Sequence, residues 1–315
     1  MAEKIAFVFP GQGAQYVGMG KDIVQNFNVA KDTFEMASEV LGFDVLKLCM
    51  EGPEEQLIKT EITQPSILTV SIAVLNVLRE LGMTCHMTAG LSLGEYTALV
   101  CANALDFEDA VGLVNKRGRF MQEAVPEGEG GMAAIIGLDA PSIQQCCQEA
   151  KDKGIVEVAN YNCPGQIVIA GQIKAVEYAC QSAKQRGAKR TVMLPVSAPF
   201  HTSMLKDAGD RLSKELEKVE IRDMEIPVVT NVTGEIIENK DQIKDLLIRQ
   251  VSNSILWEKS VRTMVENGVN TFVEIGPGKA LNGFIRKIDR NLKVANVEDM
   301  NTLKKVEKDI LEGLK

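Results

Sequence analysis

The feature that most constrains this chain is Gly90-Leu91-Ser92-Leu93-Gly94, a G-x-S-x-G pentapeptide between two apolar segments. Such a pentapeptide is typical of a nucleophile elbow, where a strand ends, the chain turns sharply, and a helix begins with the serine at the bend. Glycine on either side lets the backbone turn where a Cβ atom would clash. We expect a strand over 87–90, a helix over 93–102 and an exposed Ser92 hydroxyl. Taken alone, the pentapeptide is equally compatible with a small residue in a tight turn.

Composition limits the class of protein. The chain has 315 residues, of which 45% are hydrophobic and 25% charged, enough for one large domain with an insertion or for two domains. No apolar run reaches the roughly 18 residues that span a bilayer, so we expect no membrane association. The net charge of −8 argues against nucleic-acid binding. Seven cysteines without C-x-x-C spacing fit neither a disulfide framework nor a zinc site, which predicts a cytoplasmic protein with reduced thiols and no metal.

The periodicity of apolar residues predicts two kinds of unit along the chain. In the first part we expect strands and helices in alternation, at 5–9, 21–50, 63–78, 87–90, 93–102 and 106–122. A glycine-rich linker over 126–131 follows. After it we expect a strand at 132–138, a helix at 141–153, strands at 156–159 and 166–170, a helix at 173–186 and a strand at 189–194.

The order β-α-β-β-α-β in this second part is the ferredoxin-like pattern, which predicts a small inserted subdomain over 127–197. Alternation then resumes, with a helix at 203–218, a strand at 227–231, helices at 241–250 and 257–267, and a strand at 271–275. The predicted fold class is α/β, with a hydrolase-like core over 1–126 and 198–315. This core should have a mainly parallel sheet with helices on both faces.

Five motifs follow one another along the chain: Phe9-Pro10-Gly11-Gln12-Gly13-Ala14-Gln15, the pentapeptide with Glu95, then Arg117, Ala198-Pro199-Phe200-His201, and Glu274-Ile275-Gly276-Pro277-Gly278. As an ordered set they resemble the malonyl-CoA:acyl-carrier-protein transacylases of type II fatty acid synthesis. The same acyltransferase fold occurs as a domain in fatty acid and polyketide synthases. The resemblance extends from residue 4 to about residue 290. One departure is Leu91, because the family usually has histidine before its nucleophile.

A serine nucleophile needs a base within hydrogen-bond reach, because a free serine hydroxyl is a poor nucleophile. By motif match, the resemblance assigns these roles to Ser92 and His201. His86 is the only other histidine, and it precedes the strand that leads to the elbow, so we expect it at the opposite end of that strand. No Asp or Glu is an obvious third member of a triad. The resemblance implies instead that the main-chain carbonyl of Gln250 orients the base.

The remaining site residues are expected to bind the substrate. The main-chain N–H groups of Leu93 and Gln12 should stabilise the oxyanion, the first because it follows the nucleophile and the second by resemblance. Arg117 matches the family arginine that grips the free carboxylate of malonyl through two parallel N–H···O bonds. Phe200 resembles the bulky residue that goes with malonyl rather than methylmalonyl. Three polar residues near the first hairpin of the subdomain either line the cleft or simply form a turn: Asn160, Asn162 and Gln166.

The resemblance implies ping-pong transfer of malonyl from CoA to the phosphopantetheine thiol of acyl carrier protein in fatty acid biosynthesis, through malonyl-Ser92. Malonyl-CoA is a substrate, and no cofactor is expected. A serine thioesterase or hydrolase and a non-catalytic carrier-protein docking subunit are the alternatives. Acyl carrier proteins are acidic, as is this chain, so docking requires a local basic patch. Two stretches qualify, one with Lys189 and Arg190 and one with Arg286 and Lys287. We expect a monomer.

Overall fold

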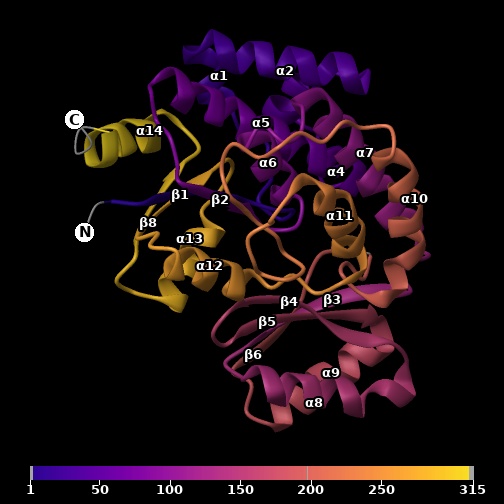
Figure 1. Cartoon of the computed structure of the whole chain (residues 1–315). Coiled ribbons are helices and arrows are strands. Elements are labelled where there is room, and N and C mark those ends of the chain that lie inside the picture. The colour runs from indigo at the N-terminus through magenta and orange to yellow at the C-terminus, as the bar shows by residue number, and fades with distance from the viewer. Residues whose placement is uncertain (1–2, 197, 312–315) are drawn as a thin grey trace.

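The computed structural model describes residues 3–196 and 198–311 and contains two sheets (Figure 1). The larger sheet has the strand order β7-β2-β1-β8-β9 and the smaller one β4-β5-β3-β6. The strands are β1 (Ile5–Phe9), β2 (Met87–Gly90), β3 (Gly130–Ile136), β4 (Val156–Cys163), β5 (Gln166–Gln172), β6 (Arg190–Met193), β7 (Val228–Val229), β8 (Thr271–Ile275) and β9 (Lys293–Val297).

The helices lie between these strands in the sequence, except the last, which follows β9. They are α1 (Lys21–Asn26), α2 (Asn28–Leu41), α3 (Val45–Glu51), α4 (Glu54–Leu57), α5 (Thr60–Glu80), α6 (Gly94–Cys101), α7 (Phe107–Glu123), α8 (Ala140–Glu149), α9 (Ile173–Gln185), α10 (Lys206–Leu216), α11 (Ile243–Ser252), α12 (Trp257–Glu266), α13 (Ala280–Ile288) and α14 (Met300–Val306). Short helical turns are η1 (Lys151–Lys153), η2 (Ser203–Leu205), η3 (Lys240–Gln242) and η4 (Glu307–Leu311).

The larger sheet is parallel throughout and buried on both faces. Side chains of a strand alternate between the two faces. In β1, Phe7 and Phe9 join an apolar cluster with α2, α5, α6 and α7, whereas Ala6 and Val8 join a second cluster with α12 and α13. A parallel sheet needs such cover on both sides. The expected mainly parallel sheet with helices on both faces is therefore confirmed.

The elbow lies at the carboxyl edge of the larger sheet. The strand order reverses at β1, since β2 and β7 lie on one side of it and β8 and β9 on the other. In open α/β sheets, ligands bind beside the carboxyl ends of the strands at such a reversal. Strands β1 and β2 both end at this edge, so the glycine-rich loop that follows β1 and the pentapeptide that begins at the end of β2 lie there together. The fold therefore brings two of the sequence motifs together.

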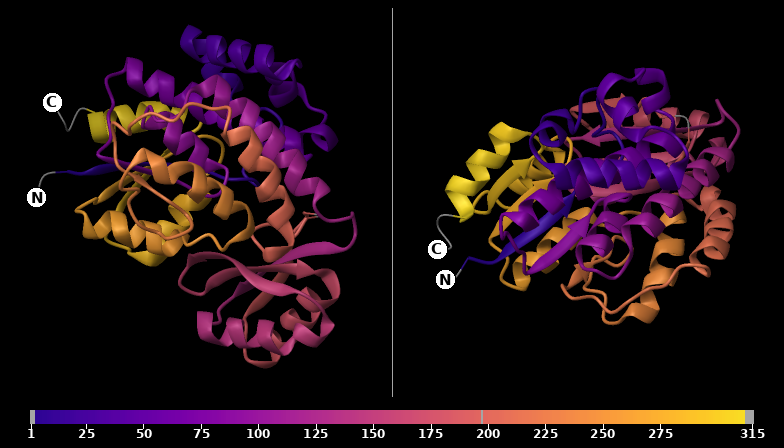
Figure 2. Two further views of the ribbon diagram at one scale, coloured as in Figure 1. Left: turned by 45° about the vertical axis from the view of Figure 1, so that its right-hand side comes forward. Right: turned by 90° about the horizontal axis from the view of Figure 1, so that it is seen from above.

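The smaller sheet has the predicted ferredoxin-like topology. Its elements run β3-α8-β4-β5-α9-β6, and every strand pairing is antiparallel. Ala133 and Ile135 of β3 pack in a separate cluster with α8 and α9, whereas Met132 and Ala134 join the core of the larger unit. The sheet thus lies between its own helices and the larger unit (Figures 1 and 2). The limits 127 and 197 of the insertion stay a prediction, and residue 197 lies outside the described residues.

The structure corrects several expected elements. The helix expected over 21–50 is three helices, because the chain is extended at Phe27 and left-handed at Gly42. The strand expected at 156–159 runs on to Cys163, and the strand expected at 227–231 is reduced to Val228–Val229. No element was predicted beyond residue 278, where the structure adds α13, β9 and α14.

Helix α5 begins at Thr60, earlier than expected, and contains Pro65. Proline has no N–H, so the carbonyl of Glu61 one turn earlier lacks its usual helical donor. The side chain of Asn115 on α7 donates to that carbonyl at 2.8 Å instead. No membrane-spanning segment was expected from the sequence, yet α5 is long and apolar enough to cross a membrane. However, 83% of its apolar 18-residue stretch is buried in the fold. A buried core helix passes the same test, and α5 packs as one.

Candidate active site

The elbow is a sharp turn held by close backbone packing. Ser92 has a φ of +54°, in the left-handed region that non-glycine residues seldom adopt. A Cβ atom at Gly90 would collide with the backbone of Gly94, and one at Gly94 would collide with the carbonyl of Phe9. Both glycines are therefore required by the space available. Backbone strain of this kind concentrates at functional sites.

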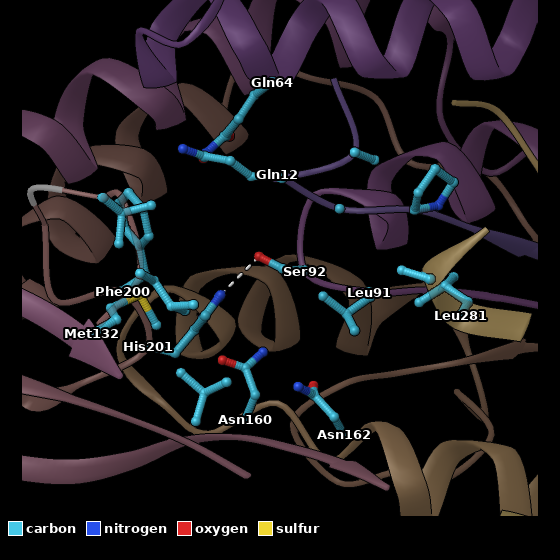
Figure 3. Close-up of a pocket in the computed structure, with 18 of the residues that line it drawn as sticks. Gln12, Gln64, Leu91, Ser92, Met132, Asn160, Asn162, Phe200, His201 and Leu281 are labelled. Atoms are coloured by element: carbon cyan, nitrogen blue, oxygen red, sulfur yellow. Dashed lines mark hydrogen bonds between the residues drawn. The ribbon is translucent and has the colours of Figure 1, made fainter. Parts of the chain in front are cut away.

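Ser92 and His201 meet across the cleft, although they are far apart in the sequence. Ser92 Oγ lies 2.8 Å from His201 Nε2 (Figure 3). His201 Nδ1 lies 2.8 Å from the main-chain oxygen of Gln250. A carbonyl oxygen only accepts, so Nδ1 carries the proton and Nε2 can accept the serine proton. His86 lies at the opposite end of β2, as expected, where its Nδ1 accepts from the N–H of Ile5 at 3.2 Å.

The surroundings of His201 keep its imidazole neutral. The residue is 4% exposed, and burial together with the nearby charge of Arg117 lowers the pKa of His201 to about 3. The hydrogen bond to Gln250 opposes this shift but does not overcome it. A neutral carbonyl thus occupies the place of a triad carboxylate. The imidazole is available as a base and holds an accepted proton weakly.

Arg117, on α7, reaches the nucleophile from inside the protein. It is 1% exposed, and its Nη2 donates to Ser92 Oγ at 3.1 Å. Nη1 donates to Gln64 Oε1 at 2.8 Å, and Nη2 also donates to Gln250 Oε1 at 2.9 Å. Its Nε has no hydrogen-bond partner in the described part of the chain. A buried guanidinium whose direct partners are neutral groups can accommodate an anion beside Ser92.

Asn231 and Glu95 support the elbow, although no role was predicted for either residue. Asn231 Oδ1 accepts from the N–H of Ser92 at 2.6 Å, and its Nδ2 donates to the carbonyl of Gly90 at 2.7 Å. Glu95 accepts from the N–H of Asn231 at 3.0 Å and from Gln250 Nε2 at 2.7 Å. Burial raises the pKa of Glu95, while these hydrogen bonds lower it. Glu95 follows the pentapeptide directly, which was a usable signal, but no local motif marks Asn231.

The two expected oxyanion donors border the nucleophile. Leu93 precedes the first residue of α6, and Gln12 lies in the loop after β1. Figure 3 shows Gln12 and Asn160 on opposite sides of Ser92. Among the described residues, no acceptor is bound to the main-chain N–H of Leu93 or Gln12. Both groups can therefore donate to a substrate oxygen.

A cavity of about 250 Å³ opens at Ser92 and His201. Asn160 and Asn162 line it from strand β4 rather than from a turn, and Phe200 lines it beside the base (Figure 3). The rest of the wall comes from the loop after β1, from residues 194 and 196, and from α5, α7, β3, β5 and α13. Leu91 also lines the cavity, so the departure from the family pattern makes this wall apolar.

Gln166 is not among the residues that line this cavity, so a role in lining the cleft, one of the two alternatives for this residue, is corrected. It lies at the start of β5, where its Oε1 accepts from Lys287 Nζ at 2.9 Å. Register across the smaller sheet pairs Gln166 with Ile136 and Ile136 with Arg190. Both basic stretches therefore lie at one end of this sheet, with these side chains exposed: Lys189, Arg190, Arg286 and Lys287. The cavity opens close by, since Phe284, one turn before Lys287, lines it.

The chain is similar to known acyltransferases along nearly its whole length. Residues 6–312 match the family model of the acyl transferase domain. A malonyl CoA-acyl carrier protein transacylase from Bacillus subtilis (strain 168) is 48% identical over 301 residues, which cover 95% of each chain.

Solved structures show the same likeness. The crystal structure of a malonyl CoA-acyl carrier protein transacylase from Clostridium perfringens Atcc 13124 is 48% identical, with a TM-score of 0.96, and the match covers 99% of this chain and 98% of that one. A type II PKS acyl-carrier protein in complex with its malonyl-transacylase matches at 44% identity and a TM-score of 0.95, covering 98% of this chain and 100% of that one.

Proposed function

Because this chain belongs to the acyl transferase domain family, we propose that it moves a malonyl group from CoA to the phosphopantetheine thiol of an acyl carrier protein. One observation carries the proposal: Ser92 Oγ contacts both a neutral imidazole and a buried guanidinium. The imidazole activates the hydroxyl. The guanidinium supplies a cation where the free carboxylate of malonyl, absent from acetyl, would lie.

In the first half-reaction, Ser92 Oγ attacks the thioester carbonyl of malonyl-CoA while His201 Nε2 accepts the hydroxyl proton. The main-chain N–H groups of Gln12 and Leu93 stabilise the negative oxygen of the tetrahedral intermediate. The C–S bond then breaks, the electron pair leaves on sulfur, and His201 returns its proton to the CoA thiolate. The low pKa of His201 favours this return. Malonyl-Ser92 remains as an ester.

In the second half-reaction, the phosphopantetheine thiol takes the place of CoA. His201 accepts the thiol proton, the sulfur attacks the ester carbonyl, and the same N–H groups stabilise the oxyanion. The bond from the carbonyl carbon to Ser92 Oγ breaks, and His201 returns its proton to that oxygen. The products are malonyl-carrier protein and free enzyme, which would supply chain elongation in fatty acid biosynthesis.

Arg117 determines the acyl class in this scheme. The malonyl carboxylate lies two carbons beyond the ester carbonyl, within reach of a guanidinium that already contacts Ser92 Oγ. The amide oxygens of Gln64 and Gln250 hold the guanidinium without neutralising it. Phe200, beside His201 in the cavity wall, restricts branching next to the reacting carbonyl.

For the acidic carrier partner, the exposed basic residues at the end of the smaller sheet offer an opposite charge. Arg286 and Lys287 are favoured over Lys189 and Arg190, because α13 also supplies part of the cavity wall. A monomeric state, a cytoplasmic location and a reaction without metal or bound cofactor stay predictions.

A serine thioesterase or hydrolase would use the same Ser92–His201 pair, and a docking subunit would need neither. Intact mass spectrometry after incubation with malonyl-CoA separates the three. We expect a malonyl adduct on the wild type that is absent in Ser92→Ala and that leaves faster with pantetheine than in buffer. Release by water at an equal rate would favour a hydrolase, and the lack of any adduct would favour a docking subunit.

A further inference from the structure

The loop that carries His201 is strained and needs support from outside. His201 has a φ of +63°, a left-handed conformation that costs a non-glycine residue about 1–3 kcal/mol. Within the loop, Thr202 Oγ1 donates to the carbonyl of Pro199 at 2.7 Å. The loop is followed at once by η2 and α10, whose first N–H groups need acceptors.

Glu157, on β4 of the smaller sheet, supplies that support. Its Oε2 accepts from the main-chain N–H of Ser203 at 2.7 Å, and its Oε1 accepts from Ser203 Oγ at 2.7 Å. Ser203 is two residues after His201. A carboxylate that accepts two hydrogen bonds from one residue fixes both the position and the orientation of that residue.

The same strand also holds the segment that orients the base. Ser254 Oγ donates to the carbonyl of Val158 at 2.5 Å, and Ile255 exchanges main-chain hydrogen bonds with the strand on either side of Asn160 at 2.8 and 2.9 Å. This segment begins just after Gln250, whose carbonyl binds His201 Nδ1. Strand β4 therefore holds both the loop of the base and the segment that orients it.

The base has room to move if this support is lost. A second cavity, of about 430 Å³, borders His201 and is separate from the cavity at Ser92. Glu157, Ser203 and residues 252–254 line it together with side chains of α8.

We propose that Glu157 is a positioning residue for His201, so that the inserted subdomain sets the geometry of the base as well as walling the cavity. It acts through Ser203 and does not touch the reacting atoms. This proposal rests on the proposed function, because it concerns the base of that reaction. Displacement of a catalytic group by about 1 Å can cost about a hundredfold in rate.

The test is Glu157→Ala, assayed by single-turnover malonylation of Ser92 with malonyl-CoA. We expect the acylation rate at saturating malonyl-CoA to fall by about tenfold or more, with the half-saturating concentration unchanged. Glu157→Gln keeps one acceptor and should recover most of the rate. Glu177→Ala, which removes an exposed acid from α9, is the matched control and should behave as the wild type.

Nuclear magnetic resonance gives a readout that a loss of stability would not mimic. The chain has two histidines, so the ring signals can be assigned, and His86 serves as an internal reference. In folded Glu157→Ala we expect the Nδ1–H signal of His201 to shift or broaden and the ring C–H signals of His86, whose Nδ1 is an acceptor, to stay in place. An unchanged acylation rate or unchanged His201 signals would overturn the proposal. A wild type that forms no malonyl adduct would overturn the proposed function instead.

Discussion

Replacement of Arg117 by alanine should remove most of the preference for malonyl-CoA over acetyl-CoA. Arg117 is 1% exposed, so solvent does not screen its charge. One hydrogen bond to a charged group contributes about 1.5–3 kcal/mol, and a two-bond grip therefore about 3–6 kcal/mol. Since 1.36 kcal/mol is a factor of ten in rate, the selectivity ratio should fall by about 10² to 10⁴.

The substitution also has a cost that is unrelated to the carboxylate. Gln64 Oε1 and Gln250 Oε1 both accept from Arg117, and both would lose this donor. Stability and total activity should therefore fall as well. The ratio of the two acylation rates, measured on one sample, cancels the loss of folded protein. Arg117→Lys keeps the charge but not the planar fork, and its ratio should be intermediate.

The assay is single-turnover acylation of Ser92 by each CoA ester, followed by intact mass. Lys116→Ala is the matched control, because Lys116 is the neighbouring cation on α7 but is half exposed and paired with Glu215 at 2.6 Å. It should leave the ratio unchanged. If Arg117→Ala retained the wild-type ratio, the guanidinium would not be the carboxylate-binding group.

Three further predictions concern titration and the elbow. Because the pKa of His201 is lowered to about 3, the rate of Ser92 acylation should stay flat between about pH 5 and 7, and a fall centred near 6.5 would refute the assignment. Glu274 caps the first turn of α13, accepting from Leu281 and Asn282 at 3.1 and 2.9 Å, and burial raises its pKa from 4.5 to about 7. The folded state then binds this proton more tightly than the unfolded state, so Glu274 should destabilise the protein progressively as pH rises from 4.5 through 7, by up to about 3 kcal/mol. In urea unfolding, the free energy of unfolding of the wild type should fall relative to that of Glu274→Gln over this pH range. If the free energies of the two proteins changed in parallel with pH, the prediction would be wrong. Asn231→Ala leaves the N–H of Ser92 and the carbonyl of Gly90 without their side-chain partner. It should lower the free energy of unfolding by about 2–4 kcal/mol and slow acylation of Ser92. Unchanged urea unfolding would show instead that water replaces the side chain.

The pattern of elements was predictable where short-range signals exist. Apolar runs bounded by glycine or proline gave β1, β2 and β8 within a residue of their observed limits. The break at Phe27 was missed, because no glycine or proline marks it. The short β7 and the edge strand β9 are stabilised by neighbouring strands rather than by their own sequence, so periodicity could not define them.

The sequence indicated the elbow, because the left-handed Ser92 and the close approach of Gly90 to Gly94 involve neighbouring residues. The clearance at Gly94 is different, since it is set by the carbonyl of Phe9, which the fold brings there. The motifs of the sequence also indicated His201 and Arg117 through their order along the chain. The tertiary structure decided which groups surround them. Every residue has a carbonyl, so only the fold can show that the one at Gln250 faces Nδ1 of His201. Likewise, Asn231 and Glu157 reach the site from distant strands and loops, and hydrogen bonds between such segments leave no trace in a local pattern.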